Sequence, residues 1–356
     1  FFKDTATTEI YTLSLHDALL ISQEKGEPMK TTVDRRGFLS VGAATATGLW
    51  LADQAAAAEA EFVKKTYTYK TVGKLKIKAD VYRADDDIVR PVIVWIHGGA
   101  LINGGRGGVS GRVKKWAQDA GYAIVSIDYR LAPETMLPEI IKDVEDAFAW
   151  IHKSGPELFK IDPTKVAVAG GSAGGYLTLT SGYRVKPRPK VLLSFWGYGD
   201  LVGKWYSEPS PHPRHQGSKL SRAEAYRQVS GPPIANSGDR EGNGGAFYQF
   251  CRQQGEWPKA VSGWDPHKQP QKFYPYMAVK NVTSQYPPTV MIHGTEDTDV
   301  PYEQSVMMAT ELKKAAVPHE LISIQGGEHG LGGGNPAAIK AAYKQAFAFV
   351  DKHLMR

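Results

Sequence analysis

The chain has 356 residues, of which 42% are hydrophobic and 22% are charged, with a formal net charge of +6 and one cysteine. This composition is ordinary for a globular protein and excludes fibrous, coiled-coil and disordered classes, while the lone Cys251 excludes an internal disulfide. Positive and negative residues are interspersed without a run of five like charges, and no basic motif indicates a nucleic-acid partner.

Residues 29–60 are typical of an export signal. A polar start at Met29 is followed by an Arg-Arg pair at positions 35 and 36 and by an apolar stretch over residues 41–51. That stretch is too short to span a bilayer, and a small-x-small cleavage pattern follows at residues 58–60. This order of regions resembles a twin-arginine signal, so we expect a periplasmic or extracellular protein without stable membrane insertion. The alternative is a stray Arg-Arg pair ahead of a buried helix.

Residues 1–28 precede this signal and do not begin with methionine. The stretch 1–22 resembles translated sequencing-adapter read-through, so we interpret residues 1–28 as a non-native extension. Peptides from this segment in native material would contradict the interpretation. The predicted folded domain is therefore residues 61–356.

Predicted strands and helices alternate along this domain. Residues 66–70 and 75–82 are rich in strand formers around a turn and predict a hairpin. Apolar runs predict strands buried on both faces at 91–96, 123–127, 166–169, 191–195, 289–292 and 321–324. Helical spacing of apolar residues predicts helices at 112–120, 138–153, 174–183, 302–316 and 337–353. The alternation predicts an α/β fold with a mostly parallel central sheet, helices on both faces and an antiparallel edge hairpin.

Residues 200–286 interrupt the alternation. They are rich in Pro, Gly, Trp, Tyr, Ser and His, with helices predicted only at 222–229 and 246–254. So long a stretch between two core strands predicts an insertion that covers one end of the sheet as a lid. The alternative is an insertion that only decorates the surface.

A G-x-S-x-G pattern at Gly170, Ser172 and Gly174 marks a candidate nucleophile. It follows an apolar strand and precedes a helix, as a nucleophile elbow requires. A β-carbon at either flanking glycine would crowd the neighbouring strand and helix. Ser172 then lies at a helix N-terminus, where the helix dipole favours developing negative charge.

Because a serine hydroxyl is a poor nucleophile at neutral pH, it needs a base, an acid that orients the base, and donors for the oxyanion. The glycine-rich loop that follows strand 91–96 predicts an oxyanion hole made by the backbone N–H groups of Gly99, Ala100 and Ala173. His329, in the loop after the last strand, is the candidate base.

The loop after strand 289–292 carries the candidate acid, Asp297. Glu296, Asp299 and the more remote Asp200 are alternatives, and the acids near residue 302 that are not catalytic are expected to cap the helix there. His212 and His215 lie close together in the sequence, but no cysteine or nearby carboxylate completes a metal set.

Together these motifs resemble the hormone-sensitive-lipase-like branch of the α/β-hydrolase esterases. The resemblance is carried by residues 97–100, 128–134 and 170–174 and by the Asp297 and His329 loops, and it spans about 65–200 and 287–354. It implies the α/β-hydrolase fold and a catalytic triad. Many relatives have a third glycine where Ala100 stands, and many have an N-terminal helical cap where this chain has a hairpin. The Asp297-x-x-Val-Pro arrangement is similar also to secreted carbohydrate esterases and to prolyl-oligopeptidase-like proteins.

The expected function is hydrolysis of short-chain or carbohydrate-linked carboxylic esters through an acyl-enzyme, without a metal or organic cofactor. Candidate pocket residues are Leu101, Ile102, Trp196 and Tyr198, unless the aromatic side chains only pack the insertion onto the sheet. A serine peptidase of the same fold and a non-catalytic hydrolase-fold binding protein are the alternatives. Lipidic, xenobiotic and polyester substrates are also compatible, and the sequence indicates no oligomeric state.

Overall fold

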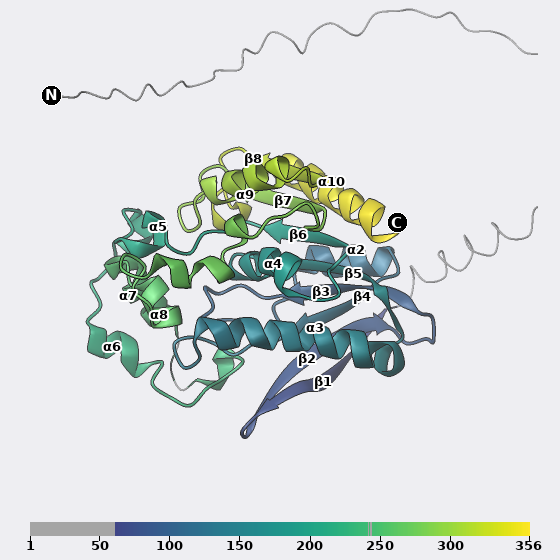
Figure 1. Ribbon diagram of the computed structural model, residues 1–356, viewed down its shortest axis with the longest axis horizontal. Coiled ribbons are helices and arrows are strands. Elements are labelled where there is room, and N and C mark those ends of the chain that lie inside the picture. Colours follow the sequence, from purple (N-terminus) through teal and green to yellow (C-terminus); the bar gives the residue numbers. More distant parts are fainter. Residues whose placement is uncertain (1–60, 241, 243) are drawn as a thin grey trace, which may run out of the picture. The chain divides into compact units, whose positions relative to one another are not determined.

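The computed structural model describes residues 61–240, 242 and 244–356. The predicted extension and export signal lie outside the described residues. An eight-stranded sheet forms the centre of the described part, in the order β1-β2-β4-β3-β5-β6-β7-β8 (Figure 1). Its strands are β1 (Phe62–Val72), β2 (Leu75–Ala84), β3 (Arg90–Ile96), β4 (Ala123–Ile127), β5 (Ile161–Gly171), β6 (Val191–Phe195), β7 (Thr289–Gly294) and β8 (His319–Ile324).

The sheet is mostly parallel, as predicted. β1, β2 and β4 pair antiparallel at one edge, and all pairs from β4–β3 to β7–β8 are parallel. In the middle of the sheet Val94 of β3 lies opposite Val125 of β4 and Val168 of β5. The parallel pairings require crossover connections, and the helices between the strands supply them.

Successive residues of the central strands face two separate cores, because strand side chains alternate between the faces of a sheet. Val92, Val94 and Ile96 of β3 belong to a core that is covered by α3 (Leu137–Phe159), α4 (Ala173–Arg184) and α9 (Glu303–Lys314). Ile93 and Trp95 belong to a second core that is covered by α2 (Gly111–Asp119) and α10 (Pro336–Leu354). Burial on both faces explains why these strands are continuous apolar runs.

The insertion at 200–286 contains short helices gathered at the left of the view in Figure 1. They are α5 (Lys204–Ser207), α6 (Arg222–Arg227), α7 (Gly244–Gln254) and α8 (Trp257–Ser262), with 3-10 turns at Pro213–His215, Ser237–Asp239, Pro270–Lys272, Tyr274–Tyr276 and Ala278–Lys280. The two helices expected in this region correspond to α6 and α7. The insertion contacts the loop that follows β3, through Trp257 and Arg240.

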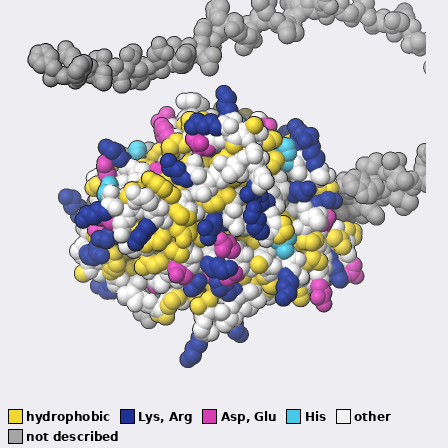
Figure 2. Space-filling model, viewed as in Figure 1, with side chains coloured by type: hydrophobic (Ala, Val, Ile, Leu, Met, Phe, Trp, Pro, Cys, Tyr) yellow, Lys and Arg dark blue, Asp and Glu magenta, His cyan; other side chains and the backbone are white. Residues whose placement is uncertain are grey.

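Lys and Arg side chains are spread over the face shown in Figure 2, among acidic and apolar ones. Within the described ranges, no helix has both the length and the apolar character needed to cross a bilayer.

The carboxyl ends of five neighbouring strands meet at one edge of the sheet. There β3 leads into His97, β5 into Ser172, β6 into Trp196, β7 into the Asp297 loop and β8 into the loop that contains His329. In open α/β sheets ligands bind outside this edge. The sheet topology therefore brings together candidate residues that are far apart in the sequence.

Candidate active site

Ser172 lies in a tight turn between β5 and α4. Its φ of 57° and ψ of −124° are strained for a residue with a side chain, a strain that is often found at active sites. The flanking glycines allow close packing, since a β-carbon on Gly174 would lie 2.1 Å from the Ile96 carbonyl oxygen. The Ser172 N–H is anchored by donation to the Phe195 carbonyl at 2.9 Å. The turn therefore holds the partly exposed serine at the head of α4.

Asp297 and His329 lie side by side although 32 residues separate them. His329 Nδ1 is 2.8 Å from Asp297 Oδ2. An ionised carboxylate only accepts hydrogen bonds, so Nδ1 donates and Nε2 of the neutral ring is left with a lone pair. This is the tautomer that a general base next to a serine needs.

The carboxylate of Asp297 is surrounded by donors. Its Oδ1 accepts the backbone N–H groups of Asp299 and Val300 at 2.9 and 2.8 Å, and its Oδ2 also lies 3.2 Å from Nε2 of His293. Burial raises the pKa of Asp297, but the hydrogen bonds from His293 and His329 outweigh burial and lower this pKa to about 2. The side chain is therefore a buried, ionised acceptor at neutral pH.

The other ring nitrogen of His329 faces a second acid. Nε2 lies 3.8 Å from Asp299 Oδ2, which is beyond hydrogen-bond length, and the Trp196 ring meets the His329 ring edge-on at 6.2 Å. In the described part of the chain, the Ser172 hydroxyl makes no hydrogen bond, so its bond to His329 is not formed here. Such bonds commonly tighten only when substrate binds.

The three predicted oxyanion donors have free N–H groups. Across residues 61–240, 242 and 244–356, no acceptor bonds the backbone N–H of Gly99, Ala100 or Ala173. The β-carbon that Gly98 lacks would lie 3.2 Å from the Ser172 Cβ, so the loop after β3 runs directly beside the serine. Unpaired N–H groups next to a serine are what an oxyanion hole requires.

The four predicted pocket residues differ in their surroundings. Trp196 is partly exposed, contacts His329 and lies over Gly171, whose missing β-carbon would be 3.2 Å from the indole Nε1. Leu101, Ile102 and Tyr198 are fully buried in the core. Tyr198 stacks on Tyr176 with ring centres 5.0 Å apart. Burial favours packing over substrate contact for these three, so Trp196 alone borders the serine turn and the histidine.

The alternative acids do not cap the helix after their loop, which corrects that expectation. α9 begins at Glu303, and no side chain caps it. Glu296 is exposed, and Asp200 accepts the N–H groups of Val202 and Gly203 in a turn of its own.

Asp299 instead binds the insertion. Its Oδ1 accepts from Tyr248 at 2.6 Å and from Arg252 at 3.2 Å, and lies 3.2 Å from Nε2 of His215. Burial raises the pKa of Asp299, yet the hydrogen bond from His215 and the charges of His329 and Arg252 lower it. Sequence analysis missed this cluster. No periodic pattern in the sequence links these residues. The one local signal was the pair of histidines His212 and His215, of which His215 belongs to the cluster.

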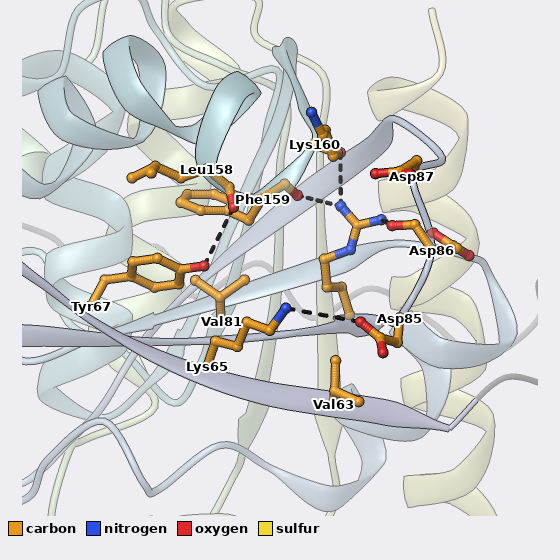
Figure 3. Close-up of a pocket in the computed structure, with 11 residues that line it drawn as sticks. Val63, Lys65, Tyr67, Val81, Asp85, Asp86, Asp87, Leu158, Phe159 and Lys160 are labelled. Carbon is orange, nitrogen blue, oxygen red and sulfur yellow. Dashed lines mark hydrogen bonds and ion pairs between the residues drawn. The ribbon is translucent and has the colours of Figure 1, made fainter.

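One cavity of about 270 Å³ lies between the β1–β2 hairpin and the end of α3 (Figure 3). Its walls are polar: Lys65 pairs with Asp85 at 3.9 Å, and the Tyr67 hydroxyl donates to the Leu158 carbonyl at 3.3 Å. Another, of about 350 Å³, lies in the insertion and includes Pro301 of the acid loop. Neither cavity is lined by a triad candidate.

Two family models match different parts of the chain. The BD-FAE model matches residues 79–189, which include the oxyanion loop and Ser172. The model described as the Prolyl oligopeptidase family matches residues 247–356, which include Asp297 and His329.

The chain is also similar to one segment of a much longer protein. Non-reducing polyketide synthase pkbA of Emericella nidulans is 27% identical in an alignment that covers 76% of this chain but 13% of that protein. The chain thus spans a small part of this relative's length.

Solved structures share the fold at low sequence identity. A truncated carbohydrate esterase from gut microbiota has a TM-score of 0.61 at 19% identity, covering 84% of this chain and 99% of that one. Carboxyl esterase 2 from the mycorrhizal fungus Tuber melanosporum has a TM-score of 0.59 at 21% identity, covering 83% and 89%.

The sheet, the arrangement of the site at the strand ends and these matches agree on one fold. The chain has the α/β-hydrolase fold, and two separate parts of it are similar to the BD-FAE and Prolyl oligopeptidase family models.

Proposed function

We propose that the protein hydrolyses carboxylic esters through an acyl-enzyme on Ser172. The single observation that carries the proposal is the 2.8 Å bond between Asp297 and His329 Nδ1, which leaves Nε2 as a base at the strand ends where Ser172 lies. Nε2 takes the hydroxyl proton as Oγ attacks the ester carbonyl. The alcohol then leaves with that proton, and water repeats the sequence to release the acid.

The oxyanion of each tetrahedral intermediate is stabilised by three backbone donors. The N–H groups of Gly99, Ala100 and Ala173 are free in the described structure and flank the serine. Backbone donors of this kind are pre-organised, so their energy is realised as negative charge develops.

The substrates that we propose are short-chain or carbohydrate-linked esters. Ala100 stands where many relatives have a glycine, and its methyl group narrows the oxyanion loop, which favours small acyl groups. The fold likeness to a carbohydrate esterase supports the sugar-linked class. We further propose that the twin-arginine-type signal at residues 29–60 exports the protein to the periplasm or the extracellular space. There it would meet esters of extracellular polymers.

The test is hydrolysis of p-nitrophenyl esters, from acetyl to long-chain acyl, by wild type and Ser172→Ala. We expect short-chain activity that falls by several orders of magnitude in the variant, as triad loss does in serine hydrolases. A fluorophosphonate should label wild type but not the variant. A folded wild type that is neither labelled nor active would contradict the proposal.

A second candidate function is peptide hydrolysis. It is favoured by the match of residues 247–356 to the Prolyl oligopeptidase family model. Matched ester and amide substrates with the same acyl group distinguish the two functions. Faster amide than ester turnover would favour the peptidase.

A further inference from the structure

A side chain of the insertion contacts the predicted oxyanion loop. The indole Nε1 of Trp257 donates a 2.9 Å hydrogen bond to the carbonyl oxygen of Ala100, and the indole is fully buried. In the part of the chain that the structure describes, this carbonyl receives no other hydrogen bond. Trp257 and Ala100 are 157 residues apart, so the contact is a product of the tertiary fold.

The bonded loop has a strained backbone. Ala100 and Leu101 have φ values of 57° and 62°, in the left-handed region that is costly for residues with a β-carbon, by about 1–2 kcal/mol each. Turn bonds hold the previous peptide, since the Gly99 carbonyl accepts from the N–H groups of Ile102 and Asn103 at 2.9 and 2.7 Å. A trans peptide directs its C=O and N–H to opposite sides, so the Ala100 N–H points away from the loop interior.

The next peptide, between Ala100 and Leu101, is held by Trp257. Without that bond, Ala100 can relax to a negative φ by rotating its peptides, and its N–H then leaves the position where an oxyanion would form. The bond therefore stabilises the one backbone conformation that aims the Ala100 N–H at the substrate.

Trp257 is itself fixed by an aromatic stack within the insertion. Its ring lies on Tyr206 with centres 4.0 Å apart, and Tyr206 lies on Trp205 at 3.6 Å. The Arg252 guanidinium lies 4.9 Å from the Tyr206 ring centre. Rotation of the indole would break this stacking, so the position of its N–H is set by the packing of α5 and α8.

We propose that Trp257 is a positioning residue that holds the oxyanion hole open through the Ala100 carbonyl, an inference that rests on the proposed serine esterase function. The insertion is then a fixed part of the catalytic apparatus. It does not swing away as a lid during turnover, because doing so would release the strained loop. Binding of the ester ground state depends little on this contact, whereas stabilisation of the oxyanion depends on it.

Trp257→Phe tests the proposal, with Trp205→Phe as a matched control. Both remove one indole N–H from the same stack, but the Nε1 of Trp205 has no hydrogen-bond partner in the described structure. We expect Trp257→Phe to lower kcat about tenfold or more with little change in KM, less than the ~10²–10³-fold effect of losing an oxyanion donor outright. Affinity for a trifluoromethyl ketone should fall in parallel. Trp205→Phe should retain wild-type kcat.

A second variant separates positioning from packing. Glycine tolerates a positive φ, so adding Ala100→Gly to Trp257→Phe should restore part of the lost kcat. A glycine at position 100 would not repair damage to α8 itself. Rates are expressed per active site titrated with fluorophosphonate, so loss of folded protein does not count as loss of rate.

Two outcomes would overturn the assignment of Trp257. One is wild-type kcat and wild-type ketone affinity in Trp257→Phe. The other is an equal loss in both Phe variants without rescue by Ala100→Gly, which would indicate packing alone. In either case, a wild type that fluorophosphonate labels and that hydrolyses short-chain esters still supports the proposed esterase function. A wild type that is neither labelled nor active instead removes the function on which the inference rests.

Discussion

His293 and His329 bond to the same oxygen, Oδ2 of Asp297, at 3.2 and 2.8 Å. Nε2 of His293 also lies 2.9 Å from the Val300 carbonyl, which only accepts, so this nitrogen carries the proton. Its Nδ1 lies 2.7 Å from the hydroxyl of Ser305. The fully buried His293 thus fixes the carboxylate from the protein interior, while the partly exposed His329 binds the same oxygen from the loop after β8.

The first prediction concerns Asp297→Asn. The amide keeps the size of the side chain but presents either a donor or a weaker acceptor to His329, which favours the wrong ring tautomer. We expect kcat on a short-chain ester to fall by about 10⁴-fold, the effect of the same change in serine proteases. Glu296→Gln is the control, because that neighbouring acid is exposed, and it should retain wild-type rates. Equal losses in both variants would exclude Asp297 as the acid.

The second prediction is a pH-dependent contribution of Asp297 to stability. Its folded-state pKa of about 2 lies below the ordinary 3.8, so the ionised form is favoured by folding. This contribution, about 2 kcal/mol, is complete above pH 4 and is lost as pH falls towards 2. Urea unfolding should therefore show that the stability gap between wild type and Asp297→Asn narrows from pH 6 to pH 2.5. A gap that stays constant would contradict the shifted pKa.

Much of the fold follows from short-range patterns. The strands at 123–127 and 191–195 have the predicted bounds, because residues buried on both faces must be apolar and the flanking turns are polar. β5 extends over Ile161–Gly171, well beyond the predicted 166–169. Its first residues include the polar Asp162 and Pro163, a residue that is normally excluded from strand interiors, and these two hid the extension.

The parts that sequence could not predict depend on long-range packing. The order of motifs identified the candidates Ser172, Asp297 and His329, since each follows a strand of the sheet. The strand before His329 was predicted to be buried on both faces, which is wrong: β8 is an edge strand and mostly only partly buried. Nothing local indicated that Asp299 binds Tyr248 and Arg252 of the insertion, because a carboxylate ahead of a helix is normally read as a cap.

The third prediction compares two glycines. A β-carbon on Gly98 would lie 2.6 Å from the Gly171 carbonyl oxygen and 3.2 Å from the Ser172 Cβ, so Gly98→Ala must displace the serine turn or the oxyanion loop. We expect kcat/KM to fall by about 10²-fold, as small displacements of reacting groups do. Gly107 has no atom within 4 Å of its missing β-carbon and no positive φ, so Gly107→Ala should be neutral. Active Gly98→Ala enzyme would show that the two loops are not in contact.

The fourth prediction concerns the bond between the acid loop and the insertion. Arg252 is 2% exposed, and its Nη1 lies 3.2 Å from Asp299 Oδ1 and donates to the Asp299 carbonyl at 2.9 Å. Asp299→Asn leaves a buried guanidinium without its counter-charge, and should destabilise the protein by about 3 kcal/mol in urea unfolding. Adding Arg252→Met should recover part of that loss, because no unpaired charge remains.

A double-mutant cycle on these two positions measures their coupling, and an exposed pair provides the matched control. Lys115 and Asp119 form an ion pair at 2.7 Å, with side chains 77% and 52% exposed, and should couple by less than about 0.5 kcal/mol. Coupling of Asp299 with Arg252 should exceed that value several-fold and should persist in 0.5 M salt, since burial limits screening. Coupling no larger than in the exposed pair would show that the insertion is held to the acid loop by packing and not by charge.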